Sequence, residues 1–237
     1  MAVLMEDTSL ECERFLVSQW AQSTPLRVRG QLSGAWNCGC QLAGREVSIS
    51  DPFQVTQAIL DILTSLNVNY LVGGSVASSL YGEPRYTQDT DIEIWADRTQ
   101  VEGLLAASQA DFYSSQEAAL EALRRKSSFN LIHFESQYKV DLFVSQNRPF
   151  DQSRAQRRLV PEGFSANFWV SSPEDMVLIK LEWYRNGRQL SDRQWRDVLG
   201  ILAARKGRLC LTYLRRWAVE LQVGNLLEQA LEQVQAL

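Results

Sequence analysis

The sequence is poor in the residues that bind transition metals. It holds one histidine, His133, and four cysteines, Cys12, Cys38, Cys40 and Cys210. Four scattered cysteines are too few for a disulfide framework, and no histidine is at hand to complete a zinc site with the Cys38–Cys40 pair. We therefore expect neither a disulfide-stapled secreted protein nor a zinc protein, and we expect His133 to pack on its strand.

Long hydrophobic runs and a strong charge of one sign are also lacking. The apolar runs fall far short of the roughly 20 residues that a membrane-spanning helix needs. The first residues, MAVLMEDTSL, place acids where a signal peptide carries basic residues. A net charge of −4 provides no general attraction for nucleic acid. We expect a soluble, cytoplasmic protein that could bind nucleic acid only at local basic patches.

Two common nucleotide-binding motifs are missing as well. The chain contains no Gly-x-x-x-x-Gly-Lys-Ser/Thr stretch and no Gly-x-Gly-x-x-Gly fingerprint. What it does contain is enough apolar material, 45% of 237 residues, for one core with a smaller helical appendage. If it binds nucleotides, it does so by another arrangement.

The secondary-structure signals become clear at residue 51. Before it, the composition is rich in turn residues, and only a short helix around Glu11–Trp20 is expected. Asp51 and Pro52 have the cap and first-turn positions of a helix that ends near Asn67. The pattern then predicts strands at Tyr70–Gly73, Thr87–Trp95, Phe129–Phe134 and Lys139–Ser145, and helices at Ser75–Leu80, Arg98–Ala107 and Gln116–Lys126.

The chain beyond residue 166 is predicted to be mostly helical. This division gives an N-terminal extension of unclear structure (1–50), a domain with a small mixed β-sheet (51–165) and a helical C-terminal region (166–237). The expected fold class is therefore α/β, in the α+β sense, with a helical C-terminal half.

Three aspartates are spaced so that they can meet on one face of the sheet. Asp89 and Asp91 lie two apart in a predicted strand and so point to the same side. Asp141 stands in KVDLFV, opposite the apolar face of its own strand. If the two strands are neighbours, three like charges converge, which is unfavourable without a cation. Oxygen-only ligands select Mg²⁺ or Mn²⁺ over zinc, so the pattern predicts a divalent-metal site.

A glycine pair precedes these acids. Gly73 and Gly74 end a predicted strand, and Ser75 opens the next helix, where free N–H groups favour an anion such as a phosphate. A glycine pair also serves tight turns without any ligand. The inference therefore depends on the whole arrangement of strand, Gly-Gly-Ser, helix, Asp-x-Asp strand and later aspartate.

With these residues the sequence resembles the nucleotidyltransferase superfamily, the polymerase-beta-like group. The resemblance is carried by Gly73-Gly74-Ser75, by Asp89 and Asp91 in TQDTDIEI, and by Asp141 in KVDLF, in the family's order. The stretch SSPEDMVLIKLEWYRNGRQLSDRQWRDVLGIL is similar to the helical segment of small bacterial members, including toxin–antitoxin toxins and abortive-infection proteins. The resemblance covers Asp51 to Ala204.

The resemblance implies an enzyme that transfers a nucleoside monophosphate from an NTP to an acceptor hydroxyl or phosphate by two-metal catalysis. Asp89, Asp91 and Asp141 would hold Mg²⁺ or Mn²⁺, and Asp141 is also the candidate base. The Gly73-Gly74-Ser75 segment would bind the triphosphate of the nucleotide.

Two cations are further candidates for the site. Lys180 stands in the apolar run MVLIKL, where its charge needs a partner, either a phosphate or an acid such as Asp197. In the related toxins the corresponding lysine and the aspartate in the Arg-Asp-Val context are implicated at the site. Arg85, in GEPRYTQD, is a candidate to help bind the triphosphate.

The acceptor is left open by the sequence. RNA such as tRNA or a protein hydroxyl is the leading expectation, with an antitoxin protein as a partner if the chain is a toxin. An antibiotic-modifying nucleotidyltransferase is one alternative and would need an acidic pocket for a cationic drug. A non-catalytic module that binds nucleotide or a partner is another, which the full set of three aspartates disfavours.

The basic clusters and the tryptophans have ordinary structural roles available to them. The clusters could contact RNA phosphates, although such runs are usually solvated helix faces; they are Arg124-Arg125-Lys126, Arg154-Arg157-Arg158, Arg205-Lys206-Arg208 and Arg215-Arg216. The seven tryptophans, including Trp169, Trp183, Trp195 and Trp217, are expected to pack in the core or between domains.

Overall fold

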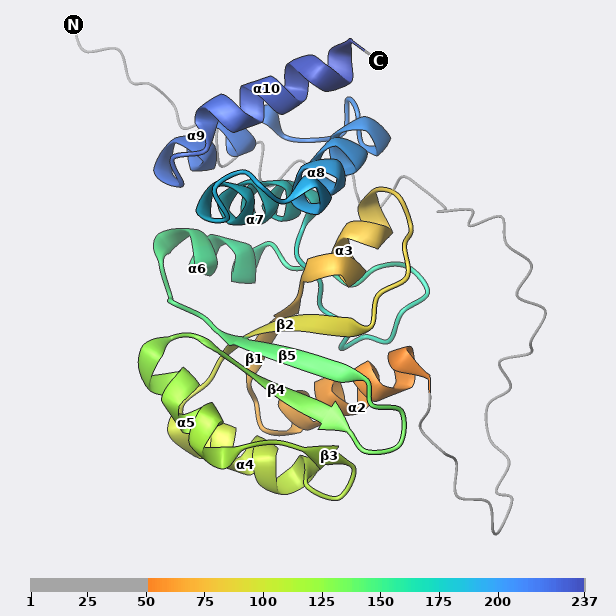
Figure 1. Cartoon of the computed structure of the whole chain (residues 1–237), viewed down its shortest axis with the longest axis vertical. Coiled ribbons are helices and arrows are strands. Elements are labelled where there is room, and N and C mark those ends of the chain that lie inside the picture. Colours follow the sequence, from red (N-terminus) through yellow and green to blue (C-terminus); the bar gives the residue numbers. More distant parts are fainter. Residues whose placement is uncertain (1–50, 237) are drawn as a thin grey trace, which may run out of the picture. The chain divides into compact units, whose positions relative to one another are not determined.

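The computed structural model describes residues 51–236 (Figure 1). The helix expected around Glu11–Trp20 and the cysteines Cys12, Cys38 and Cys40 lie outside the described residues. The elements follow in the order α2 (Pro52–Ser65), β1 (Asn69–Val72), α3 (Gly74–Tyr81), β2 (Asp89–Trp95), α4 (Arg98–Ser108), β3 (Phe112–Tyr113), α5 (Gln116–Arg125), β4 (Ser128–His133), β5 (Lys139–Val144), α6 (Pro149–Gln156), α7 (Pro173–Asn186), α8 (Asp192–Ala204), α9 (Leu211–Glu220) and α10 (Gly224–Gln235).

The predicted fold class is confirmed: the described chain forms one mixed sheet with helices packed on it. The strand order is β1-β2-β5-β4-β3. β2 runs parallel to β5, whereas its pairing with β1 and the β5–β4 and β4–β3 pairings are antiparallel. The two strands that carry the aspartates are thus neighbours at the centre of the sheet.

Each element begins where its local sequence favours it. The side chain of Asp51 caps α2 by accepting a hydrogen bond from the N–H of Phe53 at 2.7 Å, and Pro52 occupies the first turn. The strand β2 alternates strictly between half-buried and buried residues, so its polar and apolar side chains separate onto the two faces of the sheet.

Helices lie on both faces of the sheet (Figure 1). α2, α4 and α5 lie on the face to which Ile92 and Leu142 point, and both of these side chains are fully buried there. α3, α6, α7 and α8 lie on the other side. The face that carries the aspartates therefore looks toward α7.

The start of α7 is tied to the sheet edge by a short bridge. Val170 pairs in parallel with Val72, the last residue of β1, through hydrogen bonds from the Val72 N–H to the Trp169 carbonyl (2.8 Å) and from the Ser171 N–H to the Val72 carbonyl (3.1 Å). Because α7 begins three residues later, its position above the sheet is fixed at its N-terminal end.

Two elements were not predicted. β3 has only two residues, too few for an alternating pattern, and α6 carries more polar than apolar residues. It is held by ion pairs in addition to the buried Phe150. Residues Leu221–Val223 separate the last two helices.

None of the helices among residues 51–236 combines the length and the apolar character that crossing a bilayer requires. His133, as expected, packs on its strand, with its ring 5.1 Å from that of Phe112.

We predict that a buried hydroxyl chain stabilises the centre of the sheet. Thr90 of β2 shares hydrogen bonds with Thr56 (2.8 Å) and Tyr138 (2.9 Å) on the apolar side. Thr90→Val keeps the side-chain shape but removes both bonds, so we expect a loss of about 1–2 kcal/mol of unfolding free energy in urea titrations. Adding Tyr138→Phe to this variant should then cost less than it does alone, and an additive double-mutant cycle would contradict the coupling.

Candidate active site

The carboxylates of the central strands form the floor of the site. In the parallel ladder Asp91 lies directly opposite Asp141, and Asp89 lies opposite Lys139. All four side chains therefore project from the same face of the sheet, and Asp91 and Asp141 are nearest neighbours across two strands. The convergence expected from the spacing is present in the fold.

Gly74 lies directly over one of these carboxylates. Its φ of 56° is left-handed, and a Cβ at this position would lie 2.5 Å from Cγ of Asp91, within the carboxylate itself. The preceding Gly73 donates its N–H to the Asp91 carbonyl at 2.8 Å. Only glycine lets the backbone approach Asp91 this closely.

The N-terminus of α3 opens at the same point. Gly73 occupies the N-cap position and has no side chain that could accept from the first N–H groups of the helix. Ser75 follows in the first turn, and its hydroxyl accepts a short hydrogen bond from Arg85 Nη2. The start of the helix thus combines uncapped N–H groups with a guanidinium, which suits an anion.

Lys180 approaches from α7 on the other side. Its Nζ lies 2.7 Å from Oδ2 of Asp197 on α8, and the lysine side chain is only 6% exposed. Arg85 contacts the same oxygen at 3.4 Å. Of the two partners considered for Lys180, the structure supplies the acid, so Asp197 holds both cations beside Ser75.

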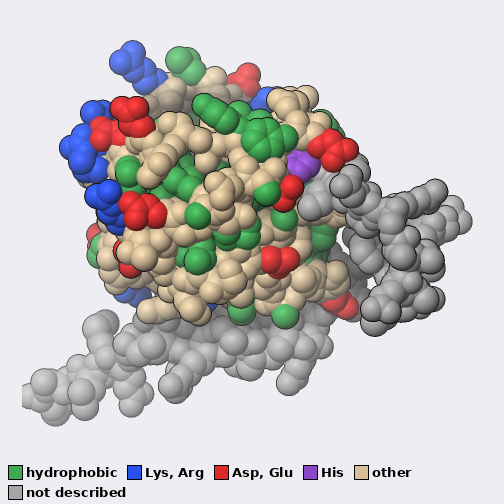
Figure 2. All heavy atoms as spheres, turned by 90° about the horizontal axis from the view of Figure 1, so that it is seen from below, with side chains coloured by type: hydrophobic (Ala, Val, Ile, Leu, Met, Phe, Trp, Pro, Cys, Tyr) green, Lys and Arg blue, Asp and Glu red, His purple; other side chains and the backbone are tan. Residues whose placement is uncertain are grey.

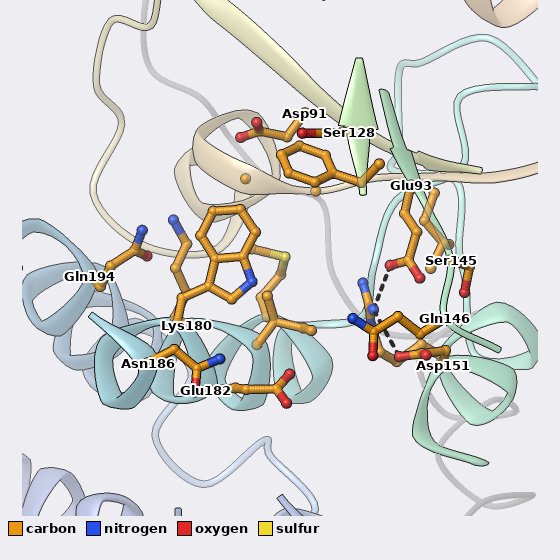
Figure 3. Close-up of a pocket in the computed structure, with 18 of the residues that line it drawn as sticks. Asp91, Glu93, Ser128, Ser145, Gln146, Asp151, Lys180, Glu182, Asn186 and Gln194 are labelled. Atoms are coloured by element: carbon orange, nitrogen blue, oxygen red, sulfur yellow. Dashed lines mark hydrogen bonds and ion pairs between the residues drawn. The ribbon is translucent and has the colours of Figure 1, made fainter. Parts of the chain in front are cut away.

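These groups line one cleft of about 630 Å³ between the sheet and α7. Figure 3 shows Asp91 and Glu93 reaching in from the sheet and Lys180 pointing toward the sheet from α7, which also carries Glu182 and Asn186. Of the expected site residues, Gly73, Gly74, Ser75, Arg85, Asp89, Asp91 and Lys180 line this cleft. Asp141 does not line it, although it lies next to Asp91 in the sheet.

Two of the three aspartates already have partners within the protein. The hydroxyl of Thr87 donates to Asp89 Oδ1 at 2.8 Å, and Lys139 Nζ lies 2.7 Å from Asp141 Oδ2. The carboxyl of Asp91 has a strongly raised pKa. Burial, followed by the charges of Asp89 and Asp141, raises the pKa of its carboxyl from 3.8 to about 6.

The described side chains are not arranged as a complete set of metal ligands. Within residues 51–236 no three His, Cys, Asp or Glu side chains are grouped so that they could hold an ion. The chemistry of the donors nevertheless fits a hard divalent cation, because only carboxylates meet at Asp91 and their repulsion is relieved by a cation. Lys139 contacts the carboxylate of Asp141, and Thr87 contacts that of Asp89.

The far end of the cleft contains ion pairs that sequence analysis missed. Arg154 is 5% exposed and lies 2.6 Å from Glu93 of β2. Arg148 bridges Asp151 at 3.0 Å and Glu182 of α7 at 2.6 Å. The proline at the start of α6 was the one visible signal of this element.

Several residues of the basic clusters are paired with acids. Arg154 belongs to a proposed RNA-contacting cluster but is buried against Glu93, and Arg157 of the same cluster lies 3.0 Å from Glu174. Arg124 and Arg125 share Glu121. Figure 2, which views the molecule from below Figure 1, shows acidic side chains interspersed among the basic ones.

Trp183 is a further correction, because we expected it to be packed away. Its side chain is 44% exposed and lines the cleft. Trp217, by contrast, is 8% exposed, as expected for a packing residue.

We predict that Gly74→Ala is more damaging than the same change at another left-handed glycine. Gly163 has a φ of 84°, and a Cβ there would meet no atom within 4 Å. Gly163→Ala should therefore cost only the backbone strain, about 1–2 kcal/mol. Gly74→Ala adds the collision with Asp91 and should lower the unfolding free energy further, as measured by denaturant titration. Equal losses in the two variants would show that the close approach is not present.

We predict that Asp91 makes the protein less stable as the pH rises. Its folded pKa of about 6 lies above the ordinary value of 3.8, so between these values the folded state binds more protons than the unfolded state. The unfolding free energy should fall from pH 4 to pH 6 for this reason.

Asp91→Asn should flatten this part of the pH profile and stabilise the protein at pH 8 by about 1–3 kcal/mol. The matched control is Asp111→Asn, which changes an exposed aspartate outside the cleft. An unchanged slope in Asp91→Asn would assign the pH dependence to other groups.

The comparisons with known proteins concern the fold. No protein-family model matches the sequence, and no curated protein matches it. Among solved structures, similarity is found to an antigenic nucleotidyltransferase-like protein from Paracoccidioides brasiliensis, with 22% identity over 76% of this chain and 92% of that one and a TM-score of 0.46.

Two further structures are similar. The antibiotic-resistance factor ANT(2'')-Ia has 15% identity over 76% of this chain and 97% of its own, with a TM-score of 0.48. The protein JHP933 from Helicobacter pylori has 13% identity over 78% of this chain and 92% of its own, with a TM-score of 0.44. A nucleotidyltransferase-like protein is thus among the solved structures to which this chain is similar.

Proposed function

We propose that this chain is an enzyme of the nucleotidyltransferase superfamily, which transfers a nucleoside monophosphate from an NTP to an acceptor hydroxyl or phosphate. The observation that carries the proposal is the register of β2 and β5, which sets Asp91 against Asp141 directly beneath the Gly73-Gly74 backbone. A fold that places like charges together under an anion-binding helix start is costly unless cation and phosphate both bind there.

The triphosphate of the donor would lie at the start of α3. The N–H groups of Gly74 and Ser75, the guanidinium of Arg85 and the ammonium of Lys180 surround this point. Asp197 keeps the two cations in place without cancelling both charges, since it is one carboxylate facing two positive groups. This arrangement favours a ligand with several negative charges.

Asp89, Asp91 and Asp141 would bind Mg²⁺ or Mn²⁺. When bound, such ions neutralise the charge that develops on the phosphate oxygens and on the leaving pyrophosphate. Asp141, which lies next to Asp91 in the sheet, would accept the proton of the acceptor hydroxyl, whose oxygen attacks the α-phosphorus while the bond to pyrophosphate breaks. Lys139 Nζ lies 2.7 Å from Oδ2 of Asp141 and would help to hold that carboxylate in position.

For the acceptor, we favour RNA such as tRNA, or a protein hydroxyl, over a cationic antibiotic. A solved relative in fold, ANT(2'')-Ia, was determined with adenylyl-2"-tobramycin, so such drugs are acceptors for that protein. In this chain Glu93, Asp151 and Glu182 of the cleft are each paired with an arginine, and they offer little free negative charge to a polycation. A toxin role with an antitoxin partner, in the cytoplasm where NTPs and Mg²⁺ are present, belongs to the same proposal.

The proposal is tested by transfer of label. With α-labelled NTPs, Mg²⁺ or Mn²⁺ and total RNA or protein extract, we expect label on a discrete acceptor together with pyrophosphate release. Asp89→Asn, Asp91→Asn and Asp141→Ala should each lower the transfer rate by several orders of magnitude while the fold survives.

Asp111→Asn serves again as the control that changes an aspartate outside the cleft and should leave the rate unchanged. The enzyme proposal is falsified if Asp141→Ala transfers label at the wild-type rate. Absence of transfer with every NTP, metal and acceptor pool, combined with intact NTP binding, would support the non-catalytic alternative.

A further inference from the structure

The exposed side chain of Trp183 in the cleft indicates a surface for a ligand. Trp183 stands on α7 three residues after Lys180, so both side chains project toward the sheet. Its side chain is 44% exposed, although the same helix buries Met176, Val177 and Leu181 almost completely. Leaving a large apolar ring open to water forgoes a sizeable hydrophobic gain, which a bound ring would recover.

Phe143 holds this indole at a defined place. Phe143 is two residues after Asp141 on β5 and projects from the same face, and its ring centroid lies 5.5 Å from that of Trp183 at an interplanar angle of 59°. The contact joins sheet and helix across the cleft. One side of the indole is therefore packed against Phe143, and the remainder is presented to the cleft beside the carboxylates.

Amide side chains surround the aromatic pair. Gln146, Asn186 and Gln194 line the same cleft and point into it from different elements (Figure 3). Oε1 of Gln194 is buried and accepts no hydrogen bond from any described residue. A buried acceptor without a donor is costly, and a ligand N–H group would satisfy it.

The charges near the aromatic pair leave it a nearly neutral surface. Glu182, adjacent to Trp183 in sequence, is paired with Arg148, and Glu93, opposite Phe143 in the sheet, is paired with Arg154. An aromatic surface with amides at its rim and balanced charges matches the face and the edge of a nucleobase. A phosphate has no ring face that could cover the indole.

We propose that Trp183 is a base-binding residue on which a nucleobase stacks, with Gln194 able to accept a hydrogen bond from that base. The base belongs either to the donor NTP or to a nucleotide of the acceptor. The proposal rests on the proposed function in taking this cleft as the nucleotide site.

Equilibrium binding to the full chain separates the two sources. Calorimetry in Mg²⁺ would use three probes: an NTP analogue with a methylene group between its α and β phosphorus atoms, inorganic tripolyphosphate, and a short oligoribonucleotide. Trp183→Ala should weaken either the NTP analogue or the oligoribonucleotide about tenfold or more, since a base stacked on an aromatic ring contributes strongly to affinity. The probe affected identifies the source of the base.

Two controls keep the test specific. Trp183→Phe retains a stacking ring and should bind within about threefold of wild type, because every base has a π-face that either ring can meet. Tyr113→Ala removes an aromatic side chain that is 56% exposed and does not line the cleft, and it should change nothing.

The outcomes that overturn the inference differ from those that overturn the function. If Trp183→Ala alters neither base-containing probe, or weakens tripolyphosphate as much as the NTP analogue, the stacking role is wrong and the nucleotidyltransferase proposal stands. If wild type binds neither the NTP analogue nor tripolyphosphate, the proposed function fails as well.

Discussion

The pairing of β2 with β5 is the constraint on which the site depends. Ile92 and Leu142 face each other in the ladder and are fully buried on the side of α2, α4 and α5. A slip of one residue would turn these side chains outward and drive the carboxylates into the core, so the apolar face fixes the register. The same register sets Asp91 against Asp141. The requirement for glycine at position 74 follows, because only a residue without Cβ can pass over the Asp91 carboxylate.

The unfavourable charge interactions of the cleft are concentrated at Asp91. Burial and two neighbouring carboxylates raise the pKa of Asp91, whereas the acids farther along the cleft are compensated. Arg154 pairs with Glu93, and Arg148 joins α6 to Glu182 of α7. These pairs connect the sheet, α6 and α7 around the cleft, which helps to hold its two walls at a fixed separation. Neutral side chains in place of these aspartates would be more stable, and this electrostatic cost is one of the observations that support the proposed binding of a cation.

The sequence was sufficient for four of the five strands and for the floor of the site, and insufficient for the far end of the cleft. Alternation in Asp89–Trp95 and the apolar period of Pro52–Ser65 are local signals, and they predicted strand and helix within two residues. Helix α6 has no apolar period; it is held by ion pairs to residues far away in the chain, which no local pattern reveals. Trp183 was misplaced for a related reason. Its exposure depends on the distance between α7 and the sheet, a tertiary property that a tryptophan in a helix does not encode.

Under the proposed function the two walls of the cleft would have different tasks. The sheet supplies the carboxylates and the Gly73-Gly74 backbone, whose positions follow from the pairing of β2 with β5. The helical half supplies Lys180 and Trp183 from α7 and Gln194 from α8. Lys180 also acts on the carboxylates, because its charge partly offsets the rise in the pKa of Asp91, whereas Trp183 and Gln194 are not among the groups that shift this pKa. Changes at Trp183 and Gln194 would therefore alter which ligand fits while the carboxylates stay in place, and in the proposed enzyme such a division would let one set of carboxylates serve different acceptors.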